Sequence, residues 1–284
     1  MLATAEPTTI DAFLGGAVEA VQPAQGHHRS GLDAVLLAAG LGAGTRGRVV
    51  DLGAGAGVAG MTLAARAPLA SVVLAEREPS LAACADAALA RAANAAFAAR
   101  VSVSIADILR DEARRSGGLL TGAFDHAIMN PPFHDGGSVR ASPNDARARA
   151  HVLDESGLDG WFRAAAALVR PRGTLAVILP ADRLGALLAA CEGRFGGLAL
   201  LPVHARPEEP ALRVLARGVK GSRAPSRLLP GLVLHGAEGS AFLPGIASIL
   251  RNGAAIGDIH PSWSDPAWGD AAPSTTTSQR EPIS

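Results

Sequence analysis

The hydrophobic positions of this chain alternate between short apolar runs, typical of buried strands, and longer Ala- and Leu-rich stretches, typical of helices. The strand-like runs are predicted at 48–52, 71–76, 101–107, 124–129, 174–179, 197–204 and 211–219. Helices are predicted between them at 57–66, about 80–97, much of 154–170, and 181–193. This order predicts a Rossmann-like α/β fold, a mostly parallel seven-stranded sheet with helices on both faces. The last two runs are too close for a crossover helix, which predicts an antiparallel C-terminal hairpin.

Composition narrows the class of protein. The chain has 284 residues, 48% hydrophobic and 18% charged, with a formal net charge of zero, which argues against a protein that coats nucleic acid by charge alone. Cys84 and Cys191 lie in helical patterns without metal-ligand spacing, so we expect two core residues, a reducing compartment and no metal site. Neither a signal peptide nor a membrane-spanning run is readable, so we expect a soluble, cytoplasmic protein.

A glycine-rich turn follows the first strand of the alternating series. The strand runs into Gly53, Gly55 and Gly57, which let backbone amides approach a ligand at a helix N-terminus. Residues 55–60 also fit G-x-G-x-x-G, the pattern of dinucleotide sites. Asp51 would repel a pyrophosphate there, but it suits a ligand that carries an ammonium, such as the methionine part of S-adenosylmethionine.

Two further carboxylates end the next two strands. Glu76 is placed to accept the ribose hydroxyls of an adenosine, and Asp107 could accept from the adenine amino group. Taken singly, each acid could equally be a helix cap or a solvated loop residue. Three carboxylates on three successive strands favour an elongated neutral-to-cationic ligand.

These features resemble a known family. The motif DLGAGAG, Glu76, Asp107 and the tetrapeptide NPPF (130–133), in this order and spacing, are similar to the class I S-adenosylmethionine-dependent methyltransferases. NPPF narrows the resemblance to enzymes that methylate amino or amide nitrogens. The chain further resembles the bacterial small-domain methyltransferases that act on the N6 of an adenine beside the anticodon of a valine tRNA. The segments that carry this resemblance are 11–16, 31–37, 220–225 and 228–235.

The resemblance implies roles for the NPPF turn and for the chain ends. Asn130 and Pro131 would accept the two hydrogens of the target amino group, Pro132 would stiffen the turn, and Phe133 would stack on an extruded base. His134 and Asp135 are more readily a loop pair that caps the turn than a catalytic dyad. Asp33 would cap its helix or touch the methionine end of the cofactor. The implied organisation is an N-terminal segment over the cofactor site (1–45), a methyltransferase domain (46–222), a C-terminal extension (223–269) and a disordered tail (270–284).

Charge is unevenly distributed along the chain. Residues 203–227 hold six basic residues against Glu208 and Glu209, while residues 228–284 are acidic. We expect Arg217, Lys220 and Arg223 to form a phosphate-binding edge for RNA, near further arginines at 140, 147 and 149. The alternative for this stretch is an ordinary solvated hairpin.

Three other functions remain open from the sequence. The same turn could present a guanine N2 of ribosomal RNA or a protein glutamine amide to the methyl donor. An NAD(P)-dependent oxidoreductase would use the G-x-G-x-x-G match, but it leaves Asp51 and NPPF unexplained. The expected activity is therefore methyl transfer from S-adenosylmethionine to an exocyclic amino group of an RNA base, with tRNA as the partner and an unknown oligomeric state.

Overall fold

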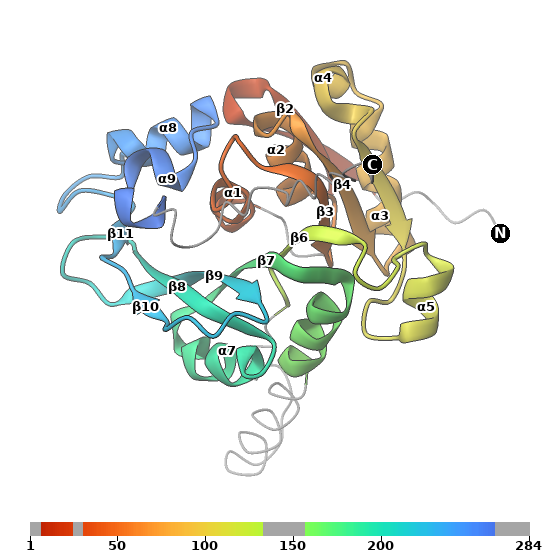
Figure 1. Ribbon diagram of the computed structural model, residues 1–284. Helices are drawn as coiled ribbons and strands as arrows, with labels where there is room; N and C mark the ends of the chain where they lie inside the picture. Colours follow the sequence, from red (N-terminus) through yellow and green to blue (C-terminus); the bar gives the residue numbers. More distant parts are fainter. Residues whose placement is uncertain (1–6, 25–30, 133–156, 265–284) are drawn as a thin grey trace, which may run out of the picture.

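A computed structural model describes residues 7–24, 31–132 and 157–264, in which one large sheet is covered by helices on both faces (Figure 1). The long strands of this sheet are β3 (Arg46–Leu52), β4 (Leu69–Glu76), β5 (Val101–Ile105), β6 (Phe124–Met129), β7 (Val169–Pro180), β8 (Phe195–His204) and β9 (Ala211–Lys220). All seven predicted strands are thus confirmed. Two short strands, β10 (Arg227–Leu228) and β11 (Leu232–Val233), pair in parallel with β8 and bring the sheet to nine strands.

The strand order is β10-β8-β9-β7-β6-β3-β4-β5. Strands β3 to β7 are parallel, and β9 runs antiparallel to both β7 and β8, as expected for the hairpin. The order reverses at β3, so the carboxyl ends of β3 and β6 lie side by side, where open α/β sheets bind ligands. This arrangement positions the glycine turn beside Asn130.

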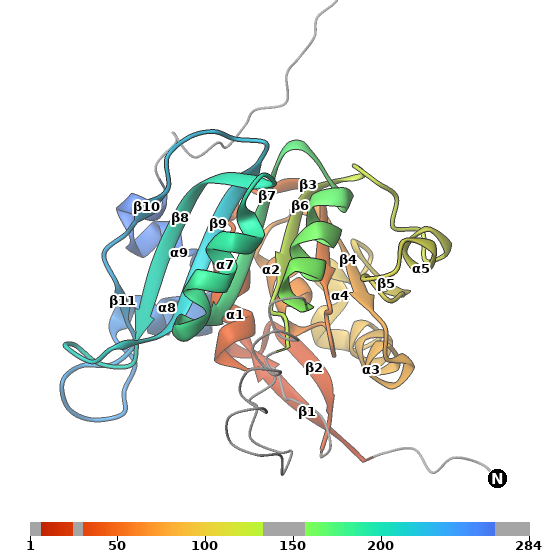
Figure 2. The ribbon, with the colours of Figure 1, turned by 90° about the horizontal axis from the view of Figure 1, so that it is seen from below.

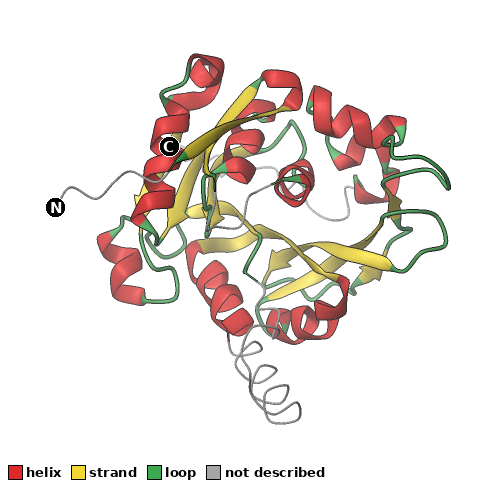
Figure 3. Ribbon diagram, turned by 180° about the vertical axis from the view of Figure 1, so that it is seen from behind, coloured by secondary structure: helices red, strands yellow, loops and turns green. Residues whose placement is uncertain are grey.

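Helices form two layers around the sheet (Figures 2 and 3). They are α1 (Leu32–Ala39), α2 (Val58–Arg66), α3 (Pro79–Leu89), α4 (Ala95–Ala98), α5 (Asp111–Ser116), α7 (Leu184–Cys191), α8 (Pro244–Asn252), α9 (Ile256–Ile259) and a helix over 157–168. Two buried clusters fill the spaces between helices and sheet, one including α1 and α2 and the other including 157–168 and α7. Cys84 and Cys191 are both buried in these layers.

The structure corrects some predicted boundaries. The helix expected over about 80–97 is interrupted after Leu89, where the buried Asn94 donates from Nδ2 to the carbonyls of Ala88 and Glu19, each at 2.7 Å. β7 begins at Val169 rather than 174, because the chain passes through a bulge in which Arg172 has a φ of 67°. The expected tail at 270–284 lies outside the described residues.

Segments at the two ends of the chain complete the fold. β1 (Thr8–Phe13) and β2 (Val18–Pro23) form a separate antiparallel sheet. Near the other end, Trp263 is 2% exposed and donates from Nε1 to the Gly40 carbonyl at 2.8 Å, while Arg217 lies over its ring at 5.0 Å. The described part of the C-terminal segment therefore packs into the same core as α1, and the domain boundaries remain predictions.

No described helix is long and apolar enough to cross a membrane.

Candidate functional site

The turn after β3 has a backbone that only glycine adopts readily. Gly53, Gly55 and Gly57 all have positive φ, at 65°, 58° and 82°. A Cβ on Gly53 would lie 2.3 Å from the Trp161 ring, and one on Gly57 would lie 2.7 Å from Leu74. Among the described residues, nothing lies within 4 Å of the position of a Cβ on Gly55. Within this part of the chain, the middle of the turn is uncovered, and its two ends are packed against the core.

Gly60, the last glycine of the G-x-G-x-x-G match, serves packing. It lies inside α2, where a Cβ would approach Leu74 Cδ2 to 2.2 Å, and its amide donates to Asp51 Oδ2 at 2.8 Å. It lets the helix approach the strands. The third glycine of a dinucleotide site has the same packing role, so Gly60 does not distinguish the two interpretations.

Asp51 is a buried carboxyl group beneath the turn. Its side chain is 2% exposed, and its one described hydrogen bond comes from the Gly60 amide. The pKa of Asp51 is raised to about 7, mainly by burial; the nearby Glu76 also raises it, and the Gly60 hydrogen bond opposes the rise. A cationic ligand group would favour the ionised form, so this residue is suited to bind one.

Glu76 ties the end of β4 to the glycine turn. Its Oε2 accepts from the Gly55 amide at 2.8 Å, and its Oε1 accepts from the amides of Arg77 and Glu78 at 2.8 and 2.9 Å. A carboxylate has about four acceptor positions, so roughly one remains. Glu76 can accept one ribose hydroxyl without change, whereas the predicted pair of hydroxyls would displace one of these amides.

The two remaining predicted cofactor residues have different surroundings. Asp107 follows β5 and accepts from the Leu109 amide at 3.0 Å through Oδ1, which caps the turn there. Asp33, in the first turn of α1, forms an ion pair with Arg213 of β9, with Oδ2 and Nε 2.9 Å apart. Capping of α1 by Asp33 stays a prediction, as does the alternative contact with the methionine end of the cofactor. Contact of either residue with the cofactor remains a prediction.

Asn130 lies next to the glycine turn, because β6 and β3 pair with Met129 opposite Leu52. Its Oδ1 is buried and accepts no hydrogen bond within the described residues. An unpaired buried acceptor typically costs about 1–3 kcal/mol, so this oxygen is set to receive a donor. Pro131 is buried and Pro132 is exposed. Phe133, His134 and Asp135 lie outside the described residues.

Trp161 is a residue of this region that the sequence analysis missed. It lies on the helix over 157–168, packs against the cluster beneath β6 and β7, and contacts Gly53. Gly160, one residue before Trp161, lies against Leu109 in the loop that holds Asp107. A Cβ on Gly160 would be 3.2 Å from Leu109 Cδ2. The helix after the NPPF turn therefore contacts both the glycine turn and the loop after β5. These segments come together only in the folded chain, so no local sequence pattern indicated that Trp161 belongs to this region.

The three predicted RNA-binding residues do not lie at this end of the sheet. Arg217 is in the middle of β9 opposite Ala176, with Nη2 donating to the Trp263 carbonyl at 2.8 Å. Lys220 ends β9 at the amino end of β7 and donates to the Val169 carbonyl at 2.8 Å. Arg223 follows it and is exposed. The arginines at 140, 147 and 149 lie outside the described residues, so the expectation that the three residues lie near them stays a prediction.

Comparisons with known proteins agree with this geometry. The model of the methyltransferase small domain matches residues 27–157. Two curated relatives from strains of Porphyromonas gingivalis, described as tRNA1(Val) (adenine(37)-N6)-methyltransferases, are 32% identical over 158 residues, which cover 55% of this chain and 60% of theirs. A crystal structure described as a predicted O-methyltransferase from Agrobacterium tumefaciens is 37% identical, with a TM-score of 0.67, covering 78% of this chain and 97% of that one. The chain belongs to the methyltransferases, and its residues 27–157 are similar to the methyltransferase small domain.

The cofactor of this methyltransferase is S-adenosylmethionine, and the residues present fit it. The buried Asp51 suits the cationic methionine end, the open turn at Gly55 leaves room for the ligand, and Glu76 retains an acceptor position. The oxidoreductase alternative is thereby overturned. The matched region spans only about three-fifths of the curated relatives' length, so their substrate is not carried over here.

Proposed function

We propose that the protein methylates the exocyclic amino group of an RNA base, adenine in a tRNA, with S-adenosylmethionine as methyl donor. The observation that carries the proposal is the buried Oδ1 of Asn130 beside the glycine turn, which accepts no hydrogen bond from any described residue. The description of the Porphyromonas gingivalis relatives supports adenine N6 and tRNA. Such a substrate implies a cytoplasmic enzyme.

The acceptors at the end of β6 suit an amino group better than a hydroxyl. The Asn130 Oδ1 and the Pro131 carbonyl can each accept one hydrogen from a planar amino group, whereas a hydroxyl has only one to give. These bonds strengthen as the nitrogen becomes tetrahedral, so they favour the transition state over the bound substrate. The cofactor supplies an electrophilic methyl group. The protein contributes the positioning and desolvation of the reacting groups. The pair of acceptors argues for N-methylation, although the Agrobacterium tumefaciens structure is described as a predicted O-methyltransferase.

Two other amino groups also carry two hydrogens, guanine N2 in ribosomal RNA and a protein glutamine amide. The acceptors described above do not distinguish them from adenine N6. We favour adenine because the curated relatives are described as adenine-N6 enzymes.

The test is the identity of the methylated product. Purified protein is incubated with tritiated S-adenosylmethionine and with unmodified tRNA, ribosomal RNA or total protein, and each sample is digested and analysed by mass spectrometry. We expect label in N6-methyladenosine from tRNA. Label in N2-methylguanosine would instead identify a guanine N2 as the substrate, and label in methylglutamine would identify a protein glutamine amide. A protein that binds the cofactor but labels none of the three would refute the proposal.

A further inference from the structure

Basic side chains gather at the end of the sheet opposite the cofactor site, here called the amino edge. It comprises the amino ends of β3, β6, β7 and β8, the carboxyl end of the antiparallel β9, and the turns that adjoin them. Its basic residues are Arg46, Arg48, Arg170, Arg172, Arg194, Lys220 and Arg223. Among the described residues, the carboxylates at this edge or paired to it are Asp125, Glu192 and Asp159. Seven basic side chains against three carboxylates leave four positive charges in excess, although the whole chain is neutral.

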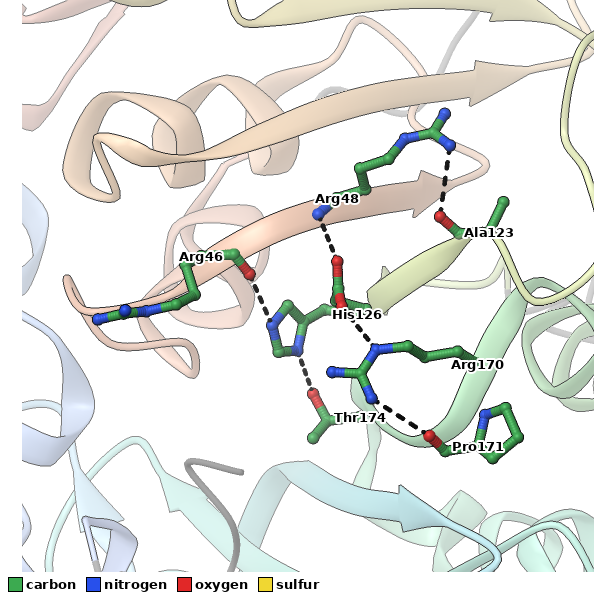
Figure 4. Close-up of polar contacts among 8 residues, drawn as sticks. Arg46, Arg48, Ala123, His126, Arg170, Pro171 and Thr174 are labelled. Atoms are coloured by element: carbon green, nitrogen blue, oxygen red, sulfur yellow. Dashed lines mark hydrogen bonds and ion pairs between the residues drawn. The ribbon is translucent and has the colours of Figure 1, made fainter. Parts of the chain in front are cut away.

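A polar network fixes the centre of the amino edge (Figure 4). Asp125 accepts from the Arg48 amide at 2.8 Å and from Arg170 Nε at 2.6 Å, which links β3, β6 and β7. Burial alone would raise the pKa of Asp125, but the hydrogen bonds from Arg170 and the Arg48 amide lower it overall. The Nδ1 of His126 lies 2.7 Å from Thr174 Oγ1, in the neighbouring strand. Each oxygen of the carboxylate therefore accepts a hydrogen bond inside the network.

The outer arginines are free to bind a ligand. Arg46, Arg172 and Arg223 are exposed, and none of them has an ion pair within the described residues. Arg46 begins β3, and Arg223 lies over the start of β8, where the Ala224 carbonyl accepts from the Gly197 amide at 3.0 Å. Four strand spacings separate β8 from β3, so the row of charges is about 19 Å wide. This width suits an extended polyanion rather than a single phosphate.

We infer that the amino edge binds the phosphate backbone of the RNA substrate, away from the nucleotide that is methylated. The inference rests on the proposed function, because it takes RNA as the substrate class. β3 is seven residues long, so its two ends are about 20 Å apart. An RNA that touches both ends of the sheet must be considerably larger than the target nucleotide and its neighbours. A folded tRNA meets this condition, and a short stem-loop does not.

The test compares two double variants that change the net charge equally. Arg46→Glu with Arg223→Glu reverses the two ends of the amino edge. Arg115→Glu with Arg251→Glu is the matched control, since both residues are exposed and lie on α5 and α8. Binding of fluorescent unmodified tRNA is measured from 50 to 200 mM salt, and calorimetry with S-adenosylmethionine checks that each variant retains its fold.

The amino-edge variant should bind tRNA at least about tenfold more weakly at 0.1 M salt, with a salt slope shallower by about 1.4–1.8, because two phosphate contacts are lost. Its KM for tRNA should rise while kcat is unchanged, and a short stem-loop should be methylated as by the wild type. Equal tRNA binding by the two double variants would overturn the inference. Binding of polyglutamate is measured with the same variants. If the amino-edge variant lost binding to polyglutamate but kept its binding to tRNA, the inference would also be overturned, because this would indicate an acidic protein partner. If the wild-type protein binds the cofactor but no RNA, the proposed function itself fails.

Discussion

Cofactor affinity should depend on pH through Asp51. The carboxyl group is 2% exposed, and burial raises its pKa to about 7. A cationic ligand group binds the ionised form, and the bound ligand holds the carboxylate ionised. Binding below pH 7 must therefore release a proton from Asp51, and the affinity must rise as the pH rises.

The expected magnitude follows from the fraction of ionised Asp51. For a pKa of about 7, roughly 3% of the groups are ionised at pH 5.5 and about half at pH 7.0, so the affinity should rise roughly fifteenfold over this range. This range of pH lies below the pKa of an α-amino group, which is about 7.7–8.0, so the ligand keeps its ammonium group throughout. At pH 6.5, binding should release about three-quarters of a proton.

Calorimetry in buffers of different ionisation enthalpy measures both quantities directly. Asp51→Asn is the control, because an amide oxygen can still accept from the Gly60 amide but has no proton to release. This variant should bind S-adenosylmethionine more weakly at pH 7 and show no release of protons. Wild-type protein with a flat affinity between pH 5.5 and 7.0, and with no proton release, would refute the assigned role of Asp51.

The same substitution should stabilise the ligand-free protein. A folded-state pKa raised above the unfolded value of 3.8 means that stability is full below pH 3.8 and is lost as the pH rises towards 7. The loss is on the order of 4 kcal/mol if the pKa is about 7. Asp51→Asn removes this loss, so its free energy of unfolding at pH 8 should exceed that of the wild type. A lower value, measured by denaturant titration, would show that the buried carboxylate is compensated by contacts not described here.

Three further predictions concern single side chains. Asn130→Ala should lower methyl transfer about 100-fold with unchanged cofactor affinity, as for loss of one well-placed polar contact; full activity in a labelling assay would contradict the role of its Oδ1. Gly53→Ala should weaken cofactor binding because its Cβ would collide with the Trp161 ring, and adding Trp161→Ala should partly restore binding in a calorimetric double-mutant cycle; additive losses would show that the ring does not press on the turn. Trp263→Ala should lower the free energy of unfolding by about 3–5 kcal/mol, and a change below 1 kcal/mol would mean that the C-terminal segment is dispensable.

The parallel core of the fold could be predicted because its signals are local. Each buried strand is a short apolar run, and β6 was predicted with its observed bounds, ending at Met129 before the two prolines. β1 and α5 were missed. The α5 sequence DEARRS has no buried residue, so no apolar stripe marks it as a helix. The bulge at Arg172 is also invisible in the sequence, since it depends on how β7 meets β6.

The predicted glycines and acids do lie at the carboxyl ends of their strands, but of the basic surface only Lys220 and Arg223 were indicated by the sequence. Grouping Arg217, Lys220 and Arg223 by sequence assumed that neighbours along the chain share a surface. β9 has ten residues and is therefore about 30 Å long, so it carries Arg213 to the ligand-binding end and Lys220 to the opposite end. The amino edge instead combines arginines from β3 and β7, which lie far apart in the sequence.

The bond between Trp263 and Gly40 has a consequence for biosynthesis. The two residues are 223 positions apart, and a ribosome adding about 5–20 residues per second needs roughly 10–45 s to make the intervening chain. During this time α1 has emerged, but the indole that covers it has not been made. The nascent polypeptide thus leaves the Gly40 end of α1 without its indole for most of its synthesis, although α2, which packs against the same helix, follows soon after it. A chain that ends before residue 263 would lack this contact.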